Sequence, residues 1–410
     1  MRGVTRPLTT VESALADLDR QMRRPPASAG RFVRSGRVPS ELRRDDFQRL
    51  HLNREEAAAF ERTLDLMGAD LRFEYMSEDE ASDALWRFAC RAFLRQKGVV
   101  KRFMTEHVKE PVTKTVYFPV ELLKVKDEIE MCGAKVLPID GDDVPPLMGQ
   151  PPVESFTAAV AVEGSGTGSK QLIQRTRAVA EHVLRVMRFA LHEDVVEDQL
   201  RFRLGEMYWL DDRRSGWQRS PERGFEADVD ATIVDRAGVI ASLPVTAGND
   251  VERQVHLAME WFERAQIATD GVIKVLFAFF ALEAVLGTDK DDETARPLAV
   301  RRAMLDVVLT ESFIDPGRMY FYYDKVRSAA VHGERVPVIN ASDVIKFTWD
   351  TKRAVTQFVA FAQSRGFTNR RQVRTALDTH ESRQKLATFL IEHDPRQWRR
   401  FFEAEGEARR

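Results

Sequence analysis

The second half of the chain repeats apolar residues at the spacing of helices. The first such face has apolar residues three or four positions apart, namely Val255, Ala258, Phe262 and Ala265. Asp270 and Gly271 interrupt this pattern, and residues 272–286 then predict an almost wholly apolar, buried helix that ends at Gly287. After the charged segment 288–294, three further helices are predicted, over residues 298–309, 319–331 and 341–363. Together these elements predict an all-α bundle.

The chain before residue 246 mixes two hydrophobic periods. Residues 57–69 and 81–94 carry apolar side chains every three to four positions, which predicts helices. Ser169 is placed to cap a long amphipathic helix over residues 170–191. Four other stretches have the composition of strands, namely residues 113–120, 156–163, 200–210 and 231–245. This part of the chain is therefore predicted to mix helices with a sheet.

These patterns divide the chain into four regions. Residues 1–45 are rich in proline, glycine and arginine, and they predict a flexible basic arm. Residues 46–245 predict a mixed α/β domain, to which we assign a sensing or regulatory role. Residues 246–365 predict the helical domain, and residues 366–410 a helical extension. The expected fold class is α+β, with a mixed α/β domain followed by an all-α bundle.

Composition narrows the class of protein. A chain of 410 residues with 43% hydrophobic and 31% charged residues can bury two ordinary cores. Its net charge of -2 argues against a uniformly basic nucleic-acid coat. The two cysteines, Cys90 and Cys132, fit neither a disulfide framework nor a zinc site. The sequence has no long uncharged apolar run and no signal-peptide pattern at its start, so we expect a cytoplasmic protein without a membrane span.

The candidate chemistry lies at the end of the fourth helix of the bundle, in YYDKVRSAAVHGERV. Arg327 and His332 are five residues apart there, just before Gly333. On a straight helix five residues turn through about 140° beyond a full circle, so the two side chains would not face each other. Two arrangements would bring such side chains together. Gly333 can unwind the last turn, or a second copy of the helix can pool two arginines and two histidines.

Arginine and histidine suit RNA cleavage without a metal. Histidine, with an ordinary pKa of about 6.5, can take the proton of a 2′-hydroxyl or protonate the leaving oxygen. Arginine offers a permanent planar cation for the phosphate oxygens of the transition state. The spacing by itself is a weak signal, because a surface arginine and a helix-capping histidine give the same pattern.

The surroundings of this motif make the signal more specific. The segment HLAMEWFERAQIATDGVIKVLFAFFALEAVLG, then LAVRRAML and YYDKVRSAAVHG, resembles the HEPN superfamily, and within it the Apea-like branch. The resemblance covers roughly residues 251–365. It implies a ribonuclease in which Arg327 and His332 are the catalytic residues of a dimer of helical bundles. Many active members have Asn, Asp or His directly after the arginine, whereas this chain has Ser328.

Other residues are expected to support this centre. Glu283 lies in a helix that is otherwise nearly uncharged, so it should meet Arg301, Arg302 or Arg327, either for stability or to orient the catalytic arginine. Tyr323 and Asp324 precede Arg327 by one turn and are secondary candidates. Four arginines are candidates for RNA binding, namely Arg301, Arg302, Arg399 and Arg400.

Two further patterns predict no site. The segment GSGTGSK at 164–170 lacks the ending of a Walker loop and the last glycine of GxGxxG, so it predicts a strand-to-helix connection. His182 and His192 lie ten residues apart without a metal-binding motif. No metal and no cofactor are therefore expected.

The sequence leaves three functions open. The first is a metal-independent endoribonuclease acting on RNA, including tRNA, in phage defence or abortive infection, with a protein partner that activates or inhibits it. The second is a catalytically inactive HEPN-like module that binds RNA, a nucleotide or a partner protein, with Ser328 marking the lapsed centre. The third places an activity in the N-terminal domain and leaves dimerisation to the helical one.

Overall fold

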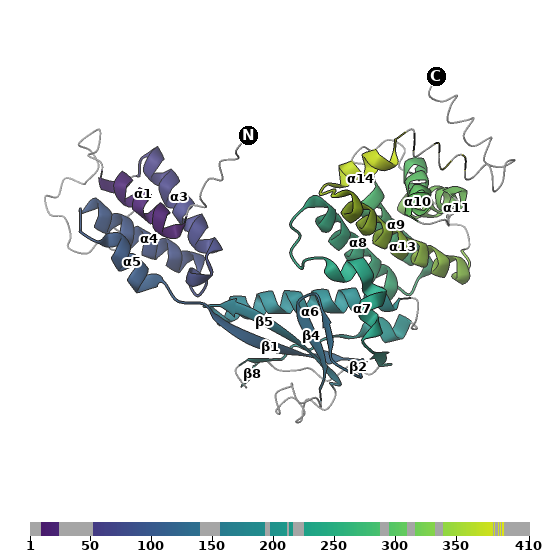
Figure 1. Ribbon diagram of the computed structural model, residues 1–410, viewed down its shortest axis with the longest axis horizontal. Helices are drawn as coiled ribbons and strands as arrows, with labels where there is room; N and C mark the ends of the chain where they lie inside the picture. Colours follow the sequence, from purple (N-terminus) through teal and green to yellow (C-terminus); the bar gives the residue numbers. More distant parts are fainter. Residues whose placement is uncertain are drawn as a thin grey trace, which may run out of the picture. The chain divides into compact units, whose positions relative to one another are not determined.

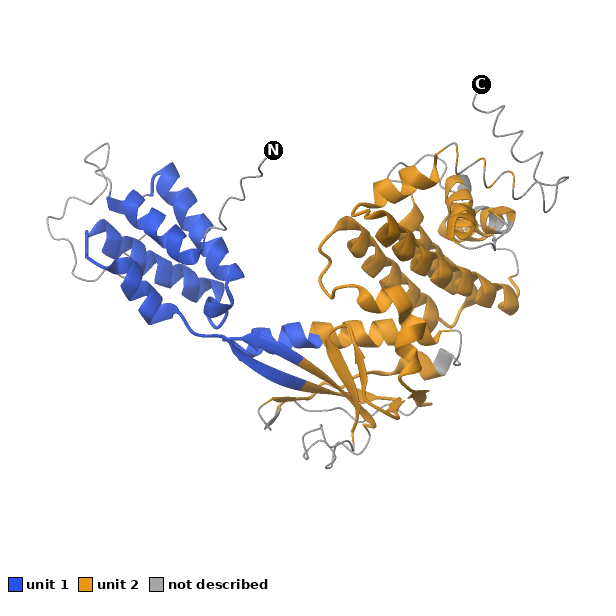
Figure 2. Cartoon of the chain, viewed as in Figure 1, with its two compact units in different colours: residues 1–116, 163–177 blue, residues 117–162, 178–410 orange. Residues whose placement is uncertain are grey.

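The protein divides into two compact units. The computed structural model describes residues 10–23, 52–139, 156–192, 197–210, 213–215, 225–287, 295–309, 316–332 and 339–379, with single residues between 381 and 388. Unit 1 comprises residues 1–116 and 163–177, and unit 2 comprises residues 117–162 and 178–410 (Figure 2). The fold is α+β, as predicted (Figure 1).

Unit 1 is built from four helices around one apolar core. These are α1 (Val11–Arg23), α3 (Arg54–Ala69), α4 (Glu78–Phe93) and α5 (Val99–His107). Asn53 and Ser77 begin α3 and α4 with capping boxes, which satisfy the first amide groups of each helix. The core gathers aromatic and aliphatic side chains from all four helices, among them Leu15, Leu18, Phe60, Phe88 and Phe103.

The helix α1 corrects the prediction of a flexible arm over residues 1–45. Val11, Leu15, Leu18 and Met22 step along one helical face and are all buried in the core of unit 1. This apolar face is reason enough for the segment to fold, although the proline- and arginine-rich stretch after it dominates the composition of the arm. Residues 24–45 lie outside the described residues.

A layer of strands lies mostly in unit 2, while its residues 112–116 and 163–166 belong to unit 1. The main sheet has the order β3-β4-β5-β1-β7-β8, with β6 paired to β1. Its strands are β1 (Val112–Glu121), β3 (Ile129–Met131), β4 (Ala134–Pro138), β5 (Ala158–Gly166), β6 (Arg203–Leu204), β7 (Tyr208–Leu210) and β8 (Arg213–Ser215). A separate parallel pair joins β2 (Leu123–Val125) to β9 (Ala227–Val229). The strands predicted near 113–120 and 156–163 are confirmed as β1 and β5.

The stretch 231–245 is helical, so the prediction of a strand there is wrong. It forms α7 (Thr232–Ala237) and a 3₁₀ helix, η4 (Gly238–Ser242). Asp230 accepts hydrogen bonds from the backbone amide of Thr232 at 3.0 Å and from its hydroxyl at 2.5 Å. This local turn at the start of the segment outweighs the strand preference of its β-branched residues.

The long helix α6 (Ser169–Leu191) contacts the helical bundle through its part in unit 2, residues 178–191. Arg188 forms an ion pair with Glu263, and its backbone carbonyl accepts a hydrogen bond from Gln266 at 3.0 Å. Lys352 donates to the carbonyl of Ala190 at 3.0 Å. These contacts join segments on the two sides of the domain boundary expected at 245/246. The division into units falls inside the predicted region 46–245.

The helical bundle follows the predicted order. It consists of α8 (Asp250–Ile267), α9 (Gly271–Leu286), α10 (Ala295–Leu309), α11 (Pro316–Phe321), the π-helical segment η5 (Tyr322–Arg327), α12 (Ser328–His332), α13 (Ala341–Arg365) and α14 (Arg370–Leu377). The predicted helices at 272–286, 298–309 and 341–363 are confirmed within a few residues. In the parts of the chain that the structure describes, no helix has the length and apolar composition needed to cross a membrane.

Three arginines satisfy the C-terminal end of the apolar helix α9. Arg301 donates from Nη1 to the carbonyl of Leu286 at 2.9 Å, and Arg370 donates to that of Ala284 at 2.9 Å. Arg374 donates to the carbonyl of Gly287. The last carbonyls of a helix have no partner inside it, and this end carries partial negative charge, so cations are favoured there.

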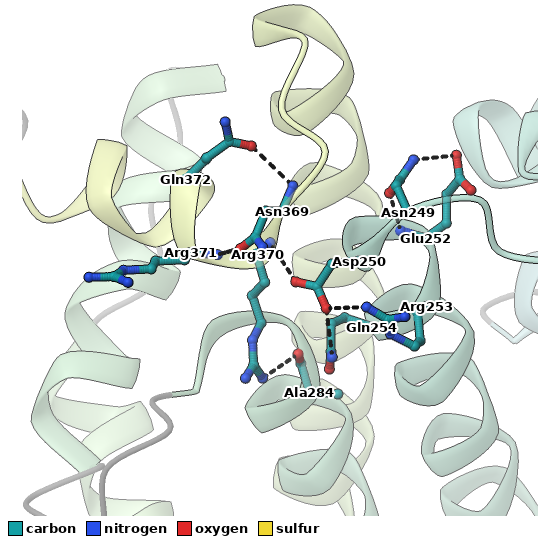
Figure 3. A network of polar contacts seen from close by, with 10 residues as sticks. All are labelled: Asn249, Asp250, Glu252, Arg253, Gln254, Ala284, Asn369, Arg370, Arg371 and Gln372. Atoms are coloured by element: carbon teal, nitrogen blue, oxygen red, sulfur yellow. Dashed lines mark hydrogen bonds and ion pairs between the residues drawn. The ribbon is translucent and has the colours of Figure 1, made fainter. Parts of the chain in front are cut away.

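Arg370, the first residue of α14, also ties that helix to the start of α8 (Figure 3). The backbone amide of Arg370 donates to Asp250 Oδ2 at 2.9 Å, while Asp250 Oδ1 accepts from Arg253 at 2.9 Å. Arg370 therefore spans two helices, with its amide on α8 and its guanidinium on α9. The residues 366–377 of the predicted C-terminal extension are thus part of the bundle, and residues 389–410 lie outside the described residues.

Replacing Arg301 with alanine is expected to destabilise unit 2 strongly. The side chain is 8% exposed and contacts Asp378 through Nη2 at 2.5 Å as well as the carbonyl of Leu286. Its loss leaves the Asp378 carboxylate and a helix carbonyl without these donors. We expect Arg301→Ala to lower the free energy of unfolding by about 3 kcal/mol, measured by urea denaturation. Arg253→Ala is the matched control, because Arg253 is 67% exposed in its ion pair with Asp250, and it should cost less than about 1 kcal/mol. Equal losses in the two variants would contradict this account.

Candidate functional site

Glu283, Tyr323 and Arg327 form one connected group. Arg327 Nη2 lies 3.1 Å from Glu283 Oε1, and each of these two side chains is 23% exposed. Tyr323 donates its hydroxyl to the same carboxylate oxygen at 2.9 Å. The guanidinium carbon of Arg327 lies 4.9 Å from the centre of the Tyr323 ring. Of the three partners expected for Glu283, the structure therefore selects Arg327.

A π-helical turn leads into this group. Residues Tyr322–Arg327 are π-helical, so the single helix predicted over 319–331 is replaced by α11, η5 and α12. A π turn closes hydrogen bonds five residues apart, which makes it wider than an α turn, and such turns are often found at functional sites. The turn contains both Tyr323 and Arg327, and it contributes Tyr322 and Val326 to the core of the bundle. Core packing thus fixes the backbone that carries the arginine.

Arg327 retains hydrogen-bonding capacity beyond its contact with Glu283. Its Nε is buried and has no hydrogen-bond partner among the described residues. A guanidinium has five N–H groups, so the ion pair with Glu283 leaves donors for an anion. Because the pair is partly buried, Glu283 also offsets the positive charge that an incoming phosphate would meet. The group can therefore hold an arginine in place while its side chain remains 23% exposed.

His332 lies at the last position of α12, and its side chain is exposed. It has no hydrogen bond or ion pair to any residue that the structure describes. The intervening residues Ser328–His332 are α-helical, so about 140° of helical rotation separates Arg327 from His332. One chain therefore presents the two side chains on different faces. Gly333, whose unwinding was one way to reconcile them, lies outside the described residues.

The remaining candidates near the motif contribute less to the geometry. Ser328 begins α12 directly after Arg327 and is partly buried. The backbone of Asp324 belongs to the π turn, but its side chain lies outside the described residues. Ser328 adds no hydrogen bond to the group formed by Glu283, Tyr323 and Arg327 in the part of the chain that the structure describes.

Arg301 and Arg302 are interior residues, so the prediction that they bind RNA is wrong. Arg301 is 7% exposed and is committed to Asp378 and Leu286. Arg302 is fully buried, with Nη1 2.9 Å from Gln357 Oε1 and 3.2 Å from Asp306 Oδ1. The helix α10 is surrounded by other helices, so its basic face points inward. Arg399 and Arg400 lie outside the described residues.

The glycine-rich segment 164–170 serves as a connection that packs closely against residues 74 and 75 of the same unit. β5 runs to Gly166 and α6 begins at Ser169. A Cβ at Gly168 would lie 3.0 Å from the backbone oxygen of Glu74 and 3.1 Å from the Cα of Tyr75. The glycine is thus needed for close approach of two backbones, and Arg175 holds the same region by its ion pair with Glu74. This arrangement agrees with the predicted strand-to-helix connection.

An aromatic face lies beside the site, and the sequence analysis did not identify it. Trp261 of α8 stacks on Phe277 of α9 with ring centres 5.8 Å apart, and its ring centre lies 4.9 Å from that of Phe280. These three rings are partly exposed, and Leu257 and Ile273 on the same two helices are each 40% exposed. Phe280 is three residues before Glu283, which places it one helical turn away. The spacing of Leu257 and Trp261, which share one side of α8 next to its core face, was the available signal.

Three histidines lie where α6 meets the bundle inside unit 2, with His182 buried and His192 and His256 partly buried. The rings of His182 and His256 are 5.2 Å apart, and the ring of His192 packs edge-on against Phe262 at 4.9 Å. Burial lowers the pKa of His182 to about 4, assisted by His256 and Arg185. Burial likewise lowers the pKa of His192 to about 4, assisted by Lys352 and Lys274. Among the described residues, no three His, Cys, Asp or Glu side chains gather as metal ligands would.

The comparisons with known proteins identify no relative. No protein-family model, curated protein or solved structure matches the chain. The resemblance to the HEPN superfamily therefore rests on the order and composition of the motifs quoted above.

His182 and His192 predict an acid-sensitive unit 2. Their folded-state pKa lies below the unfolded value of about 6.5, so the unfolded chain binds more protons and stability is present above that pH. Stability should fall as the pH drops from about 6.5 towards 4, by at most roughly 3 kcal/mol for each of His182 and His192. The measurement is urea denaturation from neutral pH down to pH ~5, where carboxylates still contribute little. The double variant His182→Gln/His192→Gln should show a flatter profile, and an unchanged slope would contradict this assignment.

Proposed function

We propose that the chain is a metal-independent endoribonuclease with Arg327 and His332 as its catalytic residues. The observation that supports it best is the fixed position of Arg327, whose guanidinium is paired with Glu283 and placed over the ring of Tyr323. An arginine held in this way, with part of its surface exposed, is suited to a phosphate in a transition state. The resemblance of the surrounding sequence to HEPN proteins points in the same direction.

The proposed reaction assigns a role to each residue. His332 takes the proton of the 2′-hydroxyl, and the 2′-oxygen attacks the adjacent phosphorus. Arg327 stabilises the charge that develops on the phosphate oxygens. A protonated histidine gives its proton to the 5′-oxygen as that bond breaks. The products are a 2′,3′-cyclic phosphate and a 5′-hydroxyl, and Glu283 and Tyr323 act as positioning residues for Arg327.

This reaction favours a centre assembled from two copies of the chain. A base and an acid are needed together, whereas one chain supplies one histidine to the motif and presents it on a different face from Arg327. Two copies would supply two histidines and two arginines. The exposed aromatic face of Trp261, Phe277 and Phe280 is the surface we assign to the second copy, because it continues along α9 to Glu283.

The wider biology follows from the resemblance alone. We propose a cytoplasmic enzyme of phage defence or abortive infection that cuts RNA, including tRNA. In this scheme the N-terminal part of the chain senses a trigger or restrains the nuclease, with or without a protein partner. The alternative is an inactive module that binds RNA, a nucleotide or a protein. One observation favours it, namely that the charge of Arg327 is already offset by Glu283 within the chain.

Cleavage of mixed tRNA and unstructured RNA in EDTA tests the proposal. We expect the wild-type chain to cut and both Arg327→Ala and His332→Ala to lose about a hundredfold or more in rate, because each removes one component of the chemistry. Arg365→Ala is the matched control, since Arg365 is an exposed arginine on α13 of the same bundle. The products should carry 2′,3′-cyclic phosphate ends.

The controls distinguish the two candidate functions. All variants are compared at equal dimer content, measured by light scattering, and at equal thermal stability. If the wild type leaves every RNA intact while it and both variants bind RNA equally well, the binding module replaces the nuclease. Cleavage that survives in both variants would remove Arg327 and His332 from the centre.

The aromatic face gives a separate prediction about assembly. Introducing charge with Trp261→Glu/Phe280→Glu should weaken the dimer about 30-fold or more, because both rings would otherwise be buried at the centre of the interface. Sedimentation velocity over a concentration series measures this change. Phe225→Glu is the control, since Phe225 is 68% exposed and lies outside the bundle. A wild-type chain that stays monomeric at every concentration would contradict the two-copy centre.

A further inference from the structure

The charges of unit 1 are separated along its helices. Between residues 52 and 86 the chain carries ten acidic residues and three basic ones. Between residues 87 and 109 the balance reverses, with Glu106 as the single acid and seven bases, namely Arg87, Arg91, Arg95, Lys97, Lys101, Arg102 and Lys109. A chain with a net charge of -2 thus concentrates positive charge on the second half of α4, the turn after it and α5.

Six of these bases form one surface, which we call the α4–α5 surface. It comprises Arg87, Arg91, Arg95, Lys97, Lys101 and Arg102. The two helices are packed together in unit 1, as Figure 1 shows. Glu106 links their bases, since it lies 2.9 Å from Arg91 of α4 and 2.6 Å from Arg102 of α5. The side chains of the other four residues are exposed.

Two acids lie at this surface, Glu106 and, in the groove beside Lys101, Glu12 of α1, and they do not cancel the charge of the six bases. Hydrogen bonds from Arg102 and Arg91 lower the pKa of Glu106 to about 2, so one carboxylate is shared by two guanidinium groups. Burial lowers the pKa of His107, and Arg87 and Arg91 lower it further, against the opposing effect of Glu106. Arg87 and Arg91, both on α4, therefore both lie near enough to His107 to lower its pKa. The net charge of the α4–α5 surface is therefore positive.

Helix stability does not account for this arrangement. Gly98 begins α5 without a side-chain cap, and Lys101 and Arg102 follow in the first turn. Cations near a helix N-terminus are unfavourable because that end already carries partial positive charge. The charges around the turn from Arg95 to Lys101 therefore add to an existing positive field.

The composition of the surface indicates its partner. Protein interfaces have a large apolar centre, whereas Phe88 and Phe103 of these helices are buried in the core of unit 1 and only Val100, Met104 and Val108 reach the groove beside Lys101. Nucleic acids are bound chiefly through phosphate oxygens by arginine and lysine, without such a centre. We propose that the α4–α5 surface binds the phosphate backbone of a nucleic acid. This site is separate from Arg327 and His332, and it does not rest on nuclease activity.

Binding to an oligonucleotide that cannot be cleaved tests this proposal. The probe is a fluorescently labelled 2′-O-methyl RNA, which lacks the attacking hydroxyl, and its binding to the full chain is followed by anisotropy at increasing salt. The variant Arg87→Gln/Lys97→Gln/Lys101→Gln should bind about tenfold more weakly. Its plot of log affinity against log salt should be shallower by about two, as expected for the loss of three phosphate contacts.

A charge-matched control separates this surface from general electrostatics. The triple variant Arg20→Gln/Arg54→Gln/Arg62→Gln removes three exposed bases from α1 and α3 of the same unit. It should bind like the wild type. Equal weakening in both triple variants, or wild-type binding too weak to measure at low salt, would overturn the proposal.

Two further probes identify the source of the phosphates. Single-stranded 2′-O-methyl RNA, its duplex and a DNA duplex of the same sequence are compared. Similar affinities for all three support recognition of the backbone alone, and a preference for either RNA probe supports RNA as the ligand. Binding of an acidic protein in preference to all three would overturn the proposal. Loss of nuclease activity with intact binding would separate a failure of the catalytic centre from a failure of this surface.

Discussion

The C-terminal end of α9 is the constraint on which the bundle depends. Residues Gly271–Leu286 are almost wholly apolar and mostly buried, so the helix ends in a region with little water to satisfy its last carbonyls. Arg301 from α10, together with Arg370 and Arg374 from α14, supplies the missing donors. Each arginine comes from a helix that must therefore dock at this point. The position of Glu283, one turn before the end, is fixed by the same requirement.

The basic residues of the bundle divide into two kinds by their partners. Arg301, Arg302 and Arg374 are buried, and their charge is used to satisfy carbonyls, Asp306 or Asp378. Arg327 is the contrasting case, since its ion pair with Glu283 remains partly exposed. The fold thus uses arginine inside the bundle as a hydrogen-bond donor to helix carbonyls and to buried polar side chains. A count of basic residues along the sequence does not distinguish these uses.

Much of the bundle could be predicted because its helices have clear apolar faces. The segments 272–286 and 341–363 were placed within two residues of α9 and α13, since helical spacing and capping residues agree there. The helix α1 was missed because the composition of its neighbours outweighed a short apolar face, and α7 was missed because a side-chain turn at Asp230 overrode strand preference. Local patterns fail where one hydrogen bond or one packed face decides the outcome.

The candidate site was predictable to a similar degree. Because burying an unpaired carboxylate costs free energy, Glu283 was predicted to lie near an arginine, as it does. The sequence did not decide among three possible partners. Only the fold shows that Arg301 and Arg302 face inward. The aromatic face beside Glu283 needs both α8 and α9 to be positioned, so no single segment reveals it.

The π turn that ends at Arg327 affects the direction in which Arg327 and His332 face. Such a turn corresponds to one residue inserted into an α-helix, and one residue of α-helix rotates everything after it by about 100°. If the residues Tyr322–Arg327 formed α turns instead, Arg327 and α12 would be rotated together by about 100° with respect to α11, and the angle between Arg327 and His332 would stay the same. The direction in which the motif faces is therefore set by the π turn together with the number of residues in it. A homologous chain shorter by one residue there would keep the pair facing the same neighbour only by replacing the π turn with an α turn.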